Sequence, residues 1–165
     1  MRVCFTGHRI STLEKYDILS VKNALEKVIS GLVCDEGANS YISGMALGTD
    51  IFAAQCVLSL KASGTDVKLE CAVPCKTQTL HWSAADKRTY NDILSKADKV
   101  TVLYDSYNRW CMFERNRYMV DNSDIVVAVY DGVSGGGTKY TVEYAQKRNR
   151  KIIIINPAEV KACEQ

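Results

Sequence analysis

The stretch "YISGMALGTDIFAAQ", residues 41 to 55, predicts a short strand, a loop bounded by Gly44 and Gly48, and a helix rich in small apolar residues. Glycine lets the backbone adopt positive φ and approach a ligand closely. The first amides of the following helix lack partners and lie at the positive end of its dipole. Such a loop favours binding of a phosphate group, although its glycines alone would also serve a tight turn.

The same alternation of strand and helix continues along the whole chain. Strands are predicted at residues 2–5, 40–43, 67–74, 99–104, 124–132 and 151–156. Helices are predicted at residues 12–33, 50–62, 83–97, 112–122 and 138–148. Strands that are apolar on both faces, such as "DIVVAVYDG", belong inside a parallel sheet covered by helices. We therefore expect residues 1–165 to form a single α/β domain: a Rossmann-like, doubly wound, mainly parallel sheet of about six strands in three layers.

Composition restricts the class of protein. Of the 165 residues, 47% are hydrophobic and 24% are charged, which is typical of a globular domain. No apolar run approaches the roughly 20 residues that span a bilayer, and the N-terminus lacks the apolar core of a secretion signal. We expect a cytoplasmic protein without a membrane partner. The net charge of +2 lacks the strong positive field of nucleic-acid-binding proteins, so nucleic acid is not expected as a partner.

Metal and cofactor signals are weak. The seven cysteines form no C-x-x-C pair and are accompanied by only two histidines, so we expect no metal site. The sequence contains neither the G-x-x-x-x-G-K-[ST] P-loop nor a G-x-G-x-x-G segment after its first strand. No cofactor is expected.

Three glycine-containing loops follow predicted strands: "FTGHR" (5–9), "SGMALGTD" (43–50) and "DGVSGGGTK" (131–139). Ligands of doubly wound sheets bind at the carboxyl ends of the strands, where these loops meet. We expect Arg9 to contact phosphate, Thr49 to cap its helix and Asp50 to contact a sugar. The candidate ligand-binding residues of the loops are Thr6, Gly7, His8, Arg9, Ser43, Gly44, Gly48, Thr49, Asp50, Asp131, Gly135, Gly136, Gly137 and Thr138.

Three further segments carry candidate residues. After the third strand, Trp82 offers a face for base stacking and Gln78 an amide for a base edge, although Trp82 would serve equally as a core residue. In "CMFERNRYM", Arg115 would contact phosphate or sugar, and Glu114 a ribose or a neighbouring side chain. Glu143 lies on the helix after the glycine run, where it would activate water or remain an exposed helix residue.

Taken together, these segments resemble the SLOG superfamily, which contains the LOG phosphoribohydrolases and the DNA-processing protein DprA. "ISGMALGTDIFAA" is similar to the DprA-type S-G-x-A-x-G-x-D loop, and "MFERNRYM" to the M-x-E-R-K-x-x-M segment of LOG enzymes. The YpsA-like branch fits the greatest length, with its T-G-[HY]-[RK] first loop and its P-x-x-x-Q-x-x-x-W segment at Pro74, Gln78 and Trp82.

The resemblance implies a nucleotide-binding domain whose ligand is a nucleotide or ADP-ribose-like small molecule, bound by a sensor or sequestering module. It also leaves open a LOG-like hydrolase that cleaves the N-glycosidic bond of a nucleoside monophosphate, with Arg115 and Glu143 as catalytic candidates. DprA-like single-strand DNA binding is a second alternative, and a homo-oligomer is expected. The chain departs from the LOG pattern P-G-G-x-G-T-x-x-E, because "SGGGTKYTVE" places Thr141 where LOG enzymes have glutamate.

Overall fold

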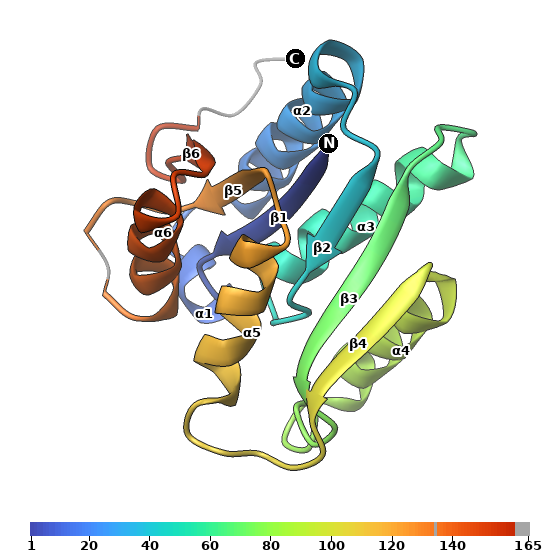
Figure 1. The fold of residues 1–165 in the computed structure, drawn as a ribbon, viewed down its shortest axis with the longest axis vertical. Helices are drawn as coiled ribbons and strands as arrows, with labels where there is room; N and C mark the ends of the chain where they lie inside the picture. Colours follow the sequence, from blue (N-terminus) through green and yellow to red (C-terminus); the bar gives the residue numbers. More distant parts are fainter. Residues whose placement is uncertain (134, 161–165) are drawn as a thin grey trace.

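The computed structural model describes residues 1–133 and 135–160 and confirms the expected fold class. All strand pairs are parallel, and the sheet order is β4-β3-β2-β1-β5-β6 (Figure 1). The elements are β1 (Arg2–Gly7), α1 (Ile10–Leu13), α2 (Ile18–Glu36), β2 (Ser40–Ser43), α3 (Thr49–Ala62), β3 (Lys68–Cys75), α4 (Ala84–Lys96), β4 (Lys99–Tyr104), α5 (Cys111–Asp121), β5 (Ile125–Val129), α6 (Gly137–Lys147) and β6 (Lys151–Ile155).

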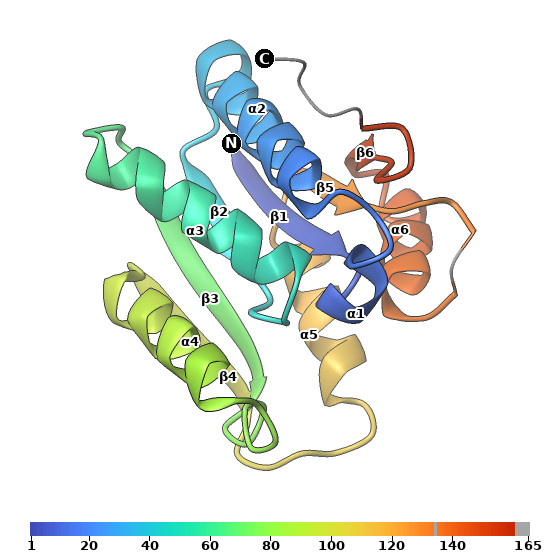
Figure 2. The ribbon, with the colours of Figure 1, turned by 180° about the vertical axis from the view of Figure 1, so that it is seen from behind.

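Helices cover both faces of the sheet, which gives three layers. Helices α2, α3 and α4 lie on one face, and α5 and α6 lie on the other (Figures 1 and 2). The larger core fills the first interface, where Phe5, Tyr41 and Leu69 are fully buried. A smaller core around Ile42 and Met119 fills the second. Each central strand therefore buries side chains on both faces, as its continuous apolar sequence predicts.

The order in which successive strands are added to the sheet changes direction at β1. Strands β1 to β4 extend the sheet one way, after which the chain returns to add β5 and β6 on the other side of β1. Gly7 at the end of β1 lies beside Val129 at the end of β5. The loops that follow these two strands thus flank the switch point, the usual ligand position in sheets of this kind.

The first predicted helix is interrupted in the structure. The apolar spacing predicts one helix over residues 12–33, whereas the chain forms α1, a break, and then α2. The side chain of Asp17 accepts hydrogen bonds from the Leu19 amide at 3.1 Å and the Ser20 hydroxyl at 2.6 Å. Asp17 is therefore an N-cap that starts α2 afresh.

Within residues 1–133 and 135–160, no helix has the length and apolar character needed to cross a membrane.

Candidate functional site

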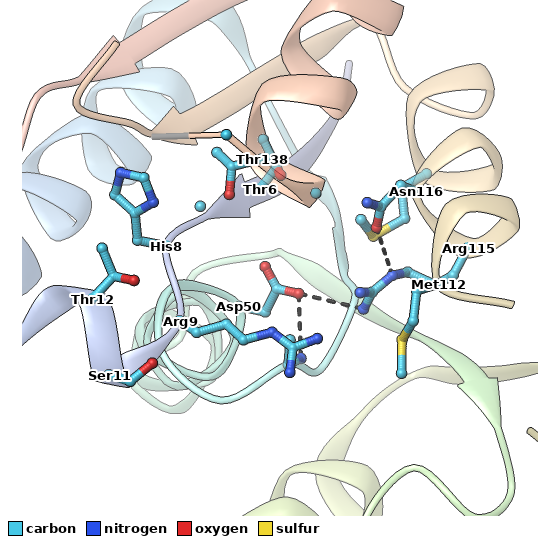
Figure 3. A pocket seen from close by; sticks show the side chains of 15 residues that line it. Thr6, His8, Arg9, Ser11, Thr12, Asp50, Met112, Arg115, Asn116 and Thr138 are labelled. Carbon is cyan, nitrogen blue, oxygen red and sulfur yellow. Dashed lines mark hydrogen bonds and ion pairs between the residues drawn. The ribbon is translucent and has the colours of Figure 1, made fainter. Parts of the chain in front are cut away.

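A polar pocket of about 250 Å³ opens at the carboxyl edge of the sheet, at the switch point (Figure 3). Three glycine-containing loops and one face of α5 form its walls. It is lined by Thr6, Gly7, His8, Arg9, Ser11, Thr12, Ala46, Asp50, Met112, Arg115, Asn116, Met119, Gly135, Gly137 and Thr138. We call it the switch-point pocket.

Nine of the residues singled out in the sequence line this pocket, and they come from four separate segments. They are Thr6, Gly7, His8, Arg9, Asp50, Arg115, Gly135, Gly137 and Thr138. The fold therefore brings together side chains and backbone that are up to 132 positions apart in the chain, between Thr6 and Thr138.

The loops after β1 and β2 are joined through their backbones. Arg9 and Gly48 form an antiparallel bridge, and the Thr49 amide and hydroxyl both donate to the His8 carbonyl, at 3.3 and 3.1 Å. Gly48 has a φ of +106°, and a Cβ there would lie 2.7 Å from the His8 carbonyl oxygen, so only glycine fits. Gly48, not Thr49, occupies the N-cap of α3, which corrects the expected cap. Gly48 and Thr49 shape the pocket wall rather than face its interior.

Ser43 and Gly44, the first residues of the second loop, fix its position. A Cβ on Gly44 would overlap the Arg115 guanidinium, and the Gly44 carbonyl accepts a hydrogen bond from Arg115 Nη1. The Ser43 hydroxyl donates to the Asp50 carbonyl at 2.8 Å and accepts from the Met45 amide at 3.2 Å. Met45 is fully buried with a φ of +60°, a costly conformation for a large side chain. This loop is therefore held rigidly.

Arg115 and Asp50 form a buried ion pair at the pocket floor, visible in Figure 3. Arg115 Nη1 lies 3.4 Å from Asp50 Oδ2, which also accepts from the Ala46 amide at 3.2 Å. Arg115 Nε donates to Asn116 Oδ1 at 2.8 Å. Burial raises the pKa of Asp50, and Arg115 and the Ala46 amide oppose this shift without cancelling it. Within the described chain Nη2 of Arg115 makes no hydrogen bond, so it can still donate to a ligand.

Arg9 lies at the mouth of the pocket and is exposed. Among residues 1–133 and 135–160, no acidic side chain forms an ion pair with it. Its charge still acts on the pocket floor, where it lowers the pKa of Asp50 slightly against the larger effect of burial. Arg9 is thus a cation available to an incoming anion.

Helix α6 presents its N-terminus to the pocket. Its N-cap, Gly136, has a φ of +98°, and no side chain of the described residues caps the first amides. Gly137 and Thr138 both line the pocket. Nearby, the Asp131 amide donates to His8 Nε2 at 3.2 Å, which ties the loop before α6 to the loop after β1. Free amides at a helix N-terminus bind anions well.

A second hollow, of about 230 Å³, adjoins the pocket and shares Arg9, Ser11, Ala46 and Met112 with it. Trp82 is half-buried on its wall and packs edge-on against Tyr90, with ring centroids 5.4 Å apart. Gln78 also lines this hollow, but its amide already donates to the Met45 carbonyl at 3.0 Å and accepts from the Tyr90 hydroxyl at 3.3 Å. Gln78 therefore supports the second loop.

Three other predicted site residues lie away from both hollows. Pro74 is buried within β3, and Glu143 is exposed on α6 and lines neither hollow. Glu114 is 41% exposed and pairs with Arg117 at 3.4 Å on the outer side of α5.

The pocket also contains residues that were not predicted, namely Ser11, Thr12, Ala46, Met112, Asn116 and Met119. The α5 residues recur at helical spacing with Arg115, so the face that carries Arg115 identifies them in retrospect. Ser11 and Thr12 lie in α1, whose separation from α2 the periodicity did not reveal. Elsewhere in the described residues, no three His, Cys, Asp or Glu side chains gather as a metal site would require.

Comparisons with known proteins agree with this architecture. Residues 3–159 match the model of the YspA SLOG family. The chain is 36% identical to the SPbeta prophage-derived protein YoqJ of Bacillus subtilis over 79% of this chain and 82% of that protein. It is 29% identical to a UPF0398 protein of Halalkalibacterium halodurans, over 99% of this chain and 92% of the relative.

Among solved structures, the fold is similar to DNA processing protein A from Helicobacter pylori, described as having a unique single-stranded DNA binding mode. The TM-score is 0.66 with 21% identity, over 93% of this chain but only 64% of that one. This comparison contradicts the expectation that nucleic acid is not a partner. The expectation rested on the net charge of +2, which averages over the whole surface, whereas a strand is bound by a local groove.

Proposed function

The chain belongs to the YspA SLOG family, and on that premise we propose that its switch-point pocket binds the phosphate group of a nucleotide without cleaving it. The observation that carries the proposal is the convergence of three positive groups on one small pocket. They are Arg9, the Nη2 of Arg115 and the N-terminus of α6, none of which is paired or capped by a side chain of the described residues. Together they suit an oxyanion better than a neutral or cationic ligand.

The adjoining hollow suits the rest of a nucleotide. It shares four lining residues with the pocket, so a ligand with its phosphate beside Arg9 extends towards Trp82 without crossing a barrier of protein. Trp82 offers an aromatic surface there, and Ile10 and Leu47 add apolar surface. A base or sugar in this hollow would bury apolar area against the indole.

The described lining of the switch-point pocket offers no unpaired carboxylate for hydrolysis. Cleavage of an N-glycosidic bond would need a carboxylate beside that bond to activate the attacking water. At the position of the LOG glutamate, Thr141 is fully buried and its hydroxyl donates to the Gly137 carbonyl at 2.7 Å. Of the described residues, Asp50 is the one carboxylate that lines the pocket, and it is already paired with Arg115. These features favour binding over catalysis.

Single-stranded DNA is the second candidate ligand, and the DNA processing protein A neighbour favours it. The phosphodiester of a strand and the phosphomonoester of a free nucleotide both present anionic oxygens, so both would use the cationic groups of the pocket. The two ligands differ in whether contacts with the protein extend beyond one nucleotide.

Calorimetric titration of the chain with inorganic phosphate and with thymidine monophosphate tests the proposal. We expect saturable binding of both, loss of at least about tenfold in affinity for Arg9→Ala, and no change for Arg88→Ala, an exposed arginine on α4. Because Arg9 makes no ion pair with the described residues, its loss should not alter the unfolding temperature without ligand. Absence of binding, or an equal loss of affinity in both variants, would refute the proposal. Release of free base from thymidine monophosphate would instead support the hydrolase alternative.

A further inference from the structure

An exposed aromatic cluster lies on α5 and α6, outside the switch-point pocket. Trp110, Phe113, Glu114, Arg117 and Tyr140 line an open groove of about 540 Å³, here called the aromatic groove. Trp110 is 55% exposed and Phe113 is 36% exposed. Large aromatic side chains left in water at one place mark a surface that binds something.

The rings form a connected series rather than scattered contacts. Trp110 and Phe113 have centroids 6.4 Å apart, and Phe113 meets Tyr140 edge-on at 4.9 Å. Tyr140 in turn stacks with Tyr144, at 6.2 Å and an angle of 11° between the rings. These contacts fix the rings in place, so binding a flat partner costs little side-chain entropy.

Guanidinium groups alternate with the rings. Arg109 lies over Trp110, 4.6 Å from the ring centroid, and Arg117 lies 5.8 Å from that of Tyr140. Arg117 Nε also donates to the Tyr140 hydroxyl at 2.5 Å. Glu114 offsets the charge of Arg117 through their pair, and Arg109 forms no ion pair with the described residues, so it stays available beside Trp110.

The groove and the pocket lie on the same two helices, α5 and α6, and share none of their lining residues. On α5, Met112 and Asn116 line the pocket, and the next residues around the helix, Phe113 and Arg117, line the groove. On α6, Thr138 lines the pocket and Tyr140 lines the groove. Because successive helix residues are about 100° apart, Phe113 and Arg117 lie on the side of α5 that adjoins the pocket face.

We propose that the aromatic groove stacks the bases of a single-stranded nucleic acid whose neighbouring nucleotide has its phosphate in the switch-point pocket. The proposal rests on the proposed function, because it requires a phosphate in the pocket. Rings interleaved with arginines, beside a phosphate site, are the surface chemistry that binds single strands without reading their sequence.

Fluorescence anisotropy with a labelled thymidine oligonucleotide of about twelve nucleotides tests the groove. We expect Trp110→Ala/Phe113→Ala to weaken strand binding by about ten- to a hundredfold and to leave the calorimetric affinity for thymidine monophosphate unchanged. Leu19→Ala, which removes a 66% exposed side chain from α2, is the matched control and should bind normally. In a Trp82→Phe background, Trp110 is the remaining tryptophan, and the strand should quench its fluorescence.

The outcomes separate the two proposals. If the monophosphate binds but the double variant holds the strand as tightly as the wild type, the groove proposal is wrong and the pocket proposal stands. If neither ligand binds, both are wrong. If the wild type is a dimer by light scattering and the double variant is a monomer, the groove is a self-association surface, and the proposal is overturned.

Discussion

Glu70 and Asp50 are both buried carboxylates, 4% and 6% exposed, but they lie at opposite ends of the sheet and in different surroundings. Glu70 lies near the amino ends of the strands, on the face covered by α5. Asp50 lies at the carboxyl ends, on the floor of the switch-point pocket. The number of hydrogen-bond donors around each one differs.

Four donors surround Glu70. Its oxygens accept from the Tyr118 hydroxyl at 2.6 Å, the Thr101 hydroxyl at 2.7 Å and Lys99 at 3.1 Å, and they also pair with Arg2. Burial alone raises the pKa of Glu70, but these donors and charges outweigh burial, so the pKa is lowered. A carboxylate whose acceptor sites are filled in this way has no remaining role for a ligand.

Asp50 has fewer partners. The described residues give it the Ala46 amide and a long contact to Arg115, and burial keeps its pKa raised. The contrast indicates that equal burial does not mean equal function. The Glu70 network is filled and stabilises the fold, whereas at Asp50 the partner Arg115 keeps Nη2 without a hydrogen bond to the described residues, as a donor for a ligand.

Removal of the filled network should have the largest effect on stability. We expect Glu70→Ala to lower the free energy of unfolding by about 3 kcal/mol, since it leaves the partly buried Arg2 and three other donors without their acceptor. Urea denaturation measures this change. Glu36→Ala, which breaks a surface pair with Lys151, should cost less than about 1 kcal/mol. Equal losses in the two variants would contradict the contrast.

Neutralisation of Asp50 should instead change anion binding. In Asp50→Asn the amide oxygen can still accept from the Ala46 amide, but the negative charge that opposes an anion is gone. We expect affinity for sulfate to rise severalfold. In the wild type, sulfate affinity should increase as the pH falls, because the raised pKa of Asp50 favours protonation; in Asp50→Asn this component should vanish.

The smallest effect is a change in the pH dependence of stability, with opposite signs at the two sites. The pKa of Glu70 is below its ordinary value near 4.5, so its contribution is present above that pH and is lost as the pH falls through the folded-state pKa. Glu70→Gln should flatten the acid loss of stability. The pKa of Asp50 is raised, so Asp50→Asn should steepen that loss. Urea midpoints between neutral and acidic pH measure the pH dependence of stability in each variant. If both substitutions changed it in the same direction, the opposite pKa shifts of Glu70 and Asp50 would be contradicted.

The sequence was sufficient to predict the alternation of strands and helices and the edge of the sheet at which the loops meet, because apolar runs and glycines are local signals. It did not reveal the break between α1 and α2, since the apolar spacing continues through residues 13–18 while the Asp17 cap interrupts the helix. It also missed the Glu70 network, because Glu70 lies within an apolar strand and its partner Tyr118 is 48 residues away.

The roles of individual loop residues were harder to predict than their positions. Gln78 and Thr49 have side chains suited to a ligand, yet their hydrogen bonds go to backbone carbonyls of the protein's own loops. Whether a polar group faces a ligand or supports a loop depends on contacts across more than 30 residues of chain, such as that of Gln78 with Met45. No local sequence pattern predicts such long-range contacts.

The proposed function requires that a phosphate group binds at the carboxyl edge of the sheet, on the N-terminus of α6. A titration of the ¹⁵N-labelled chain with inorganic phosphate, monitored by the chemical shifts of the backbone amides, tests this placement. We expect saturable shifts at Gly137, Thr138 and Arg9, and none at Glu70 or Thr101. Shifts confined to the amino edge around Glu70, or no shifts at phosphate concentrations that raise the unfolding temperature, would contradict the claim.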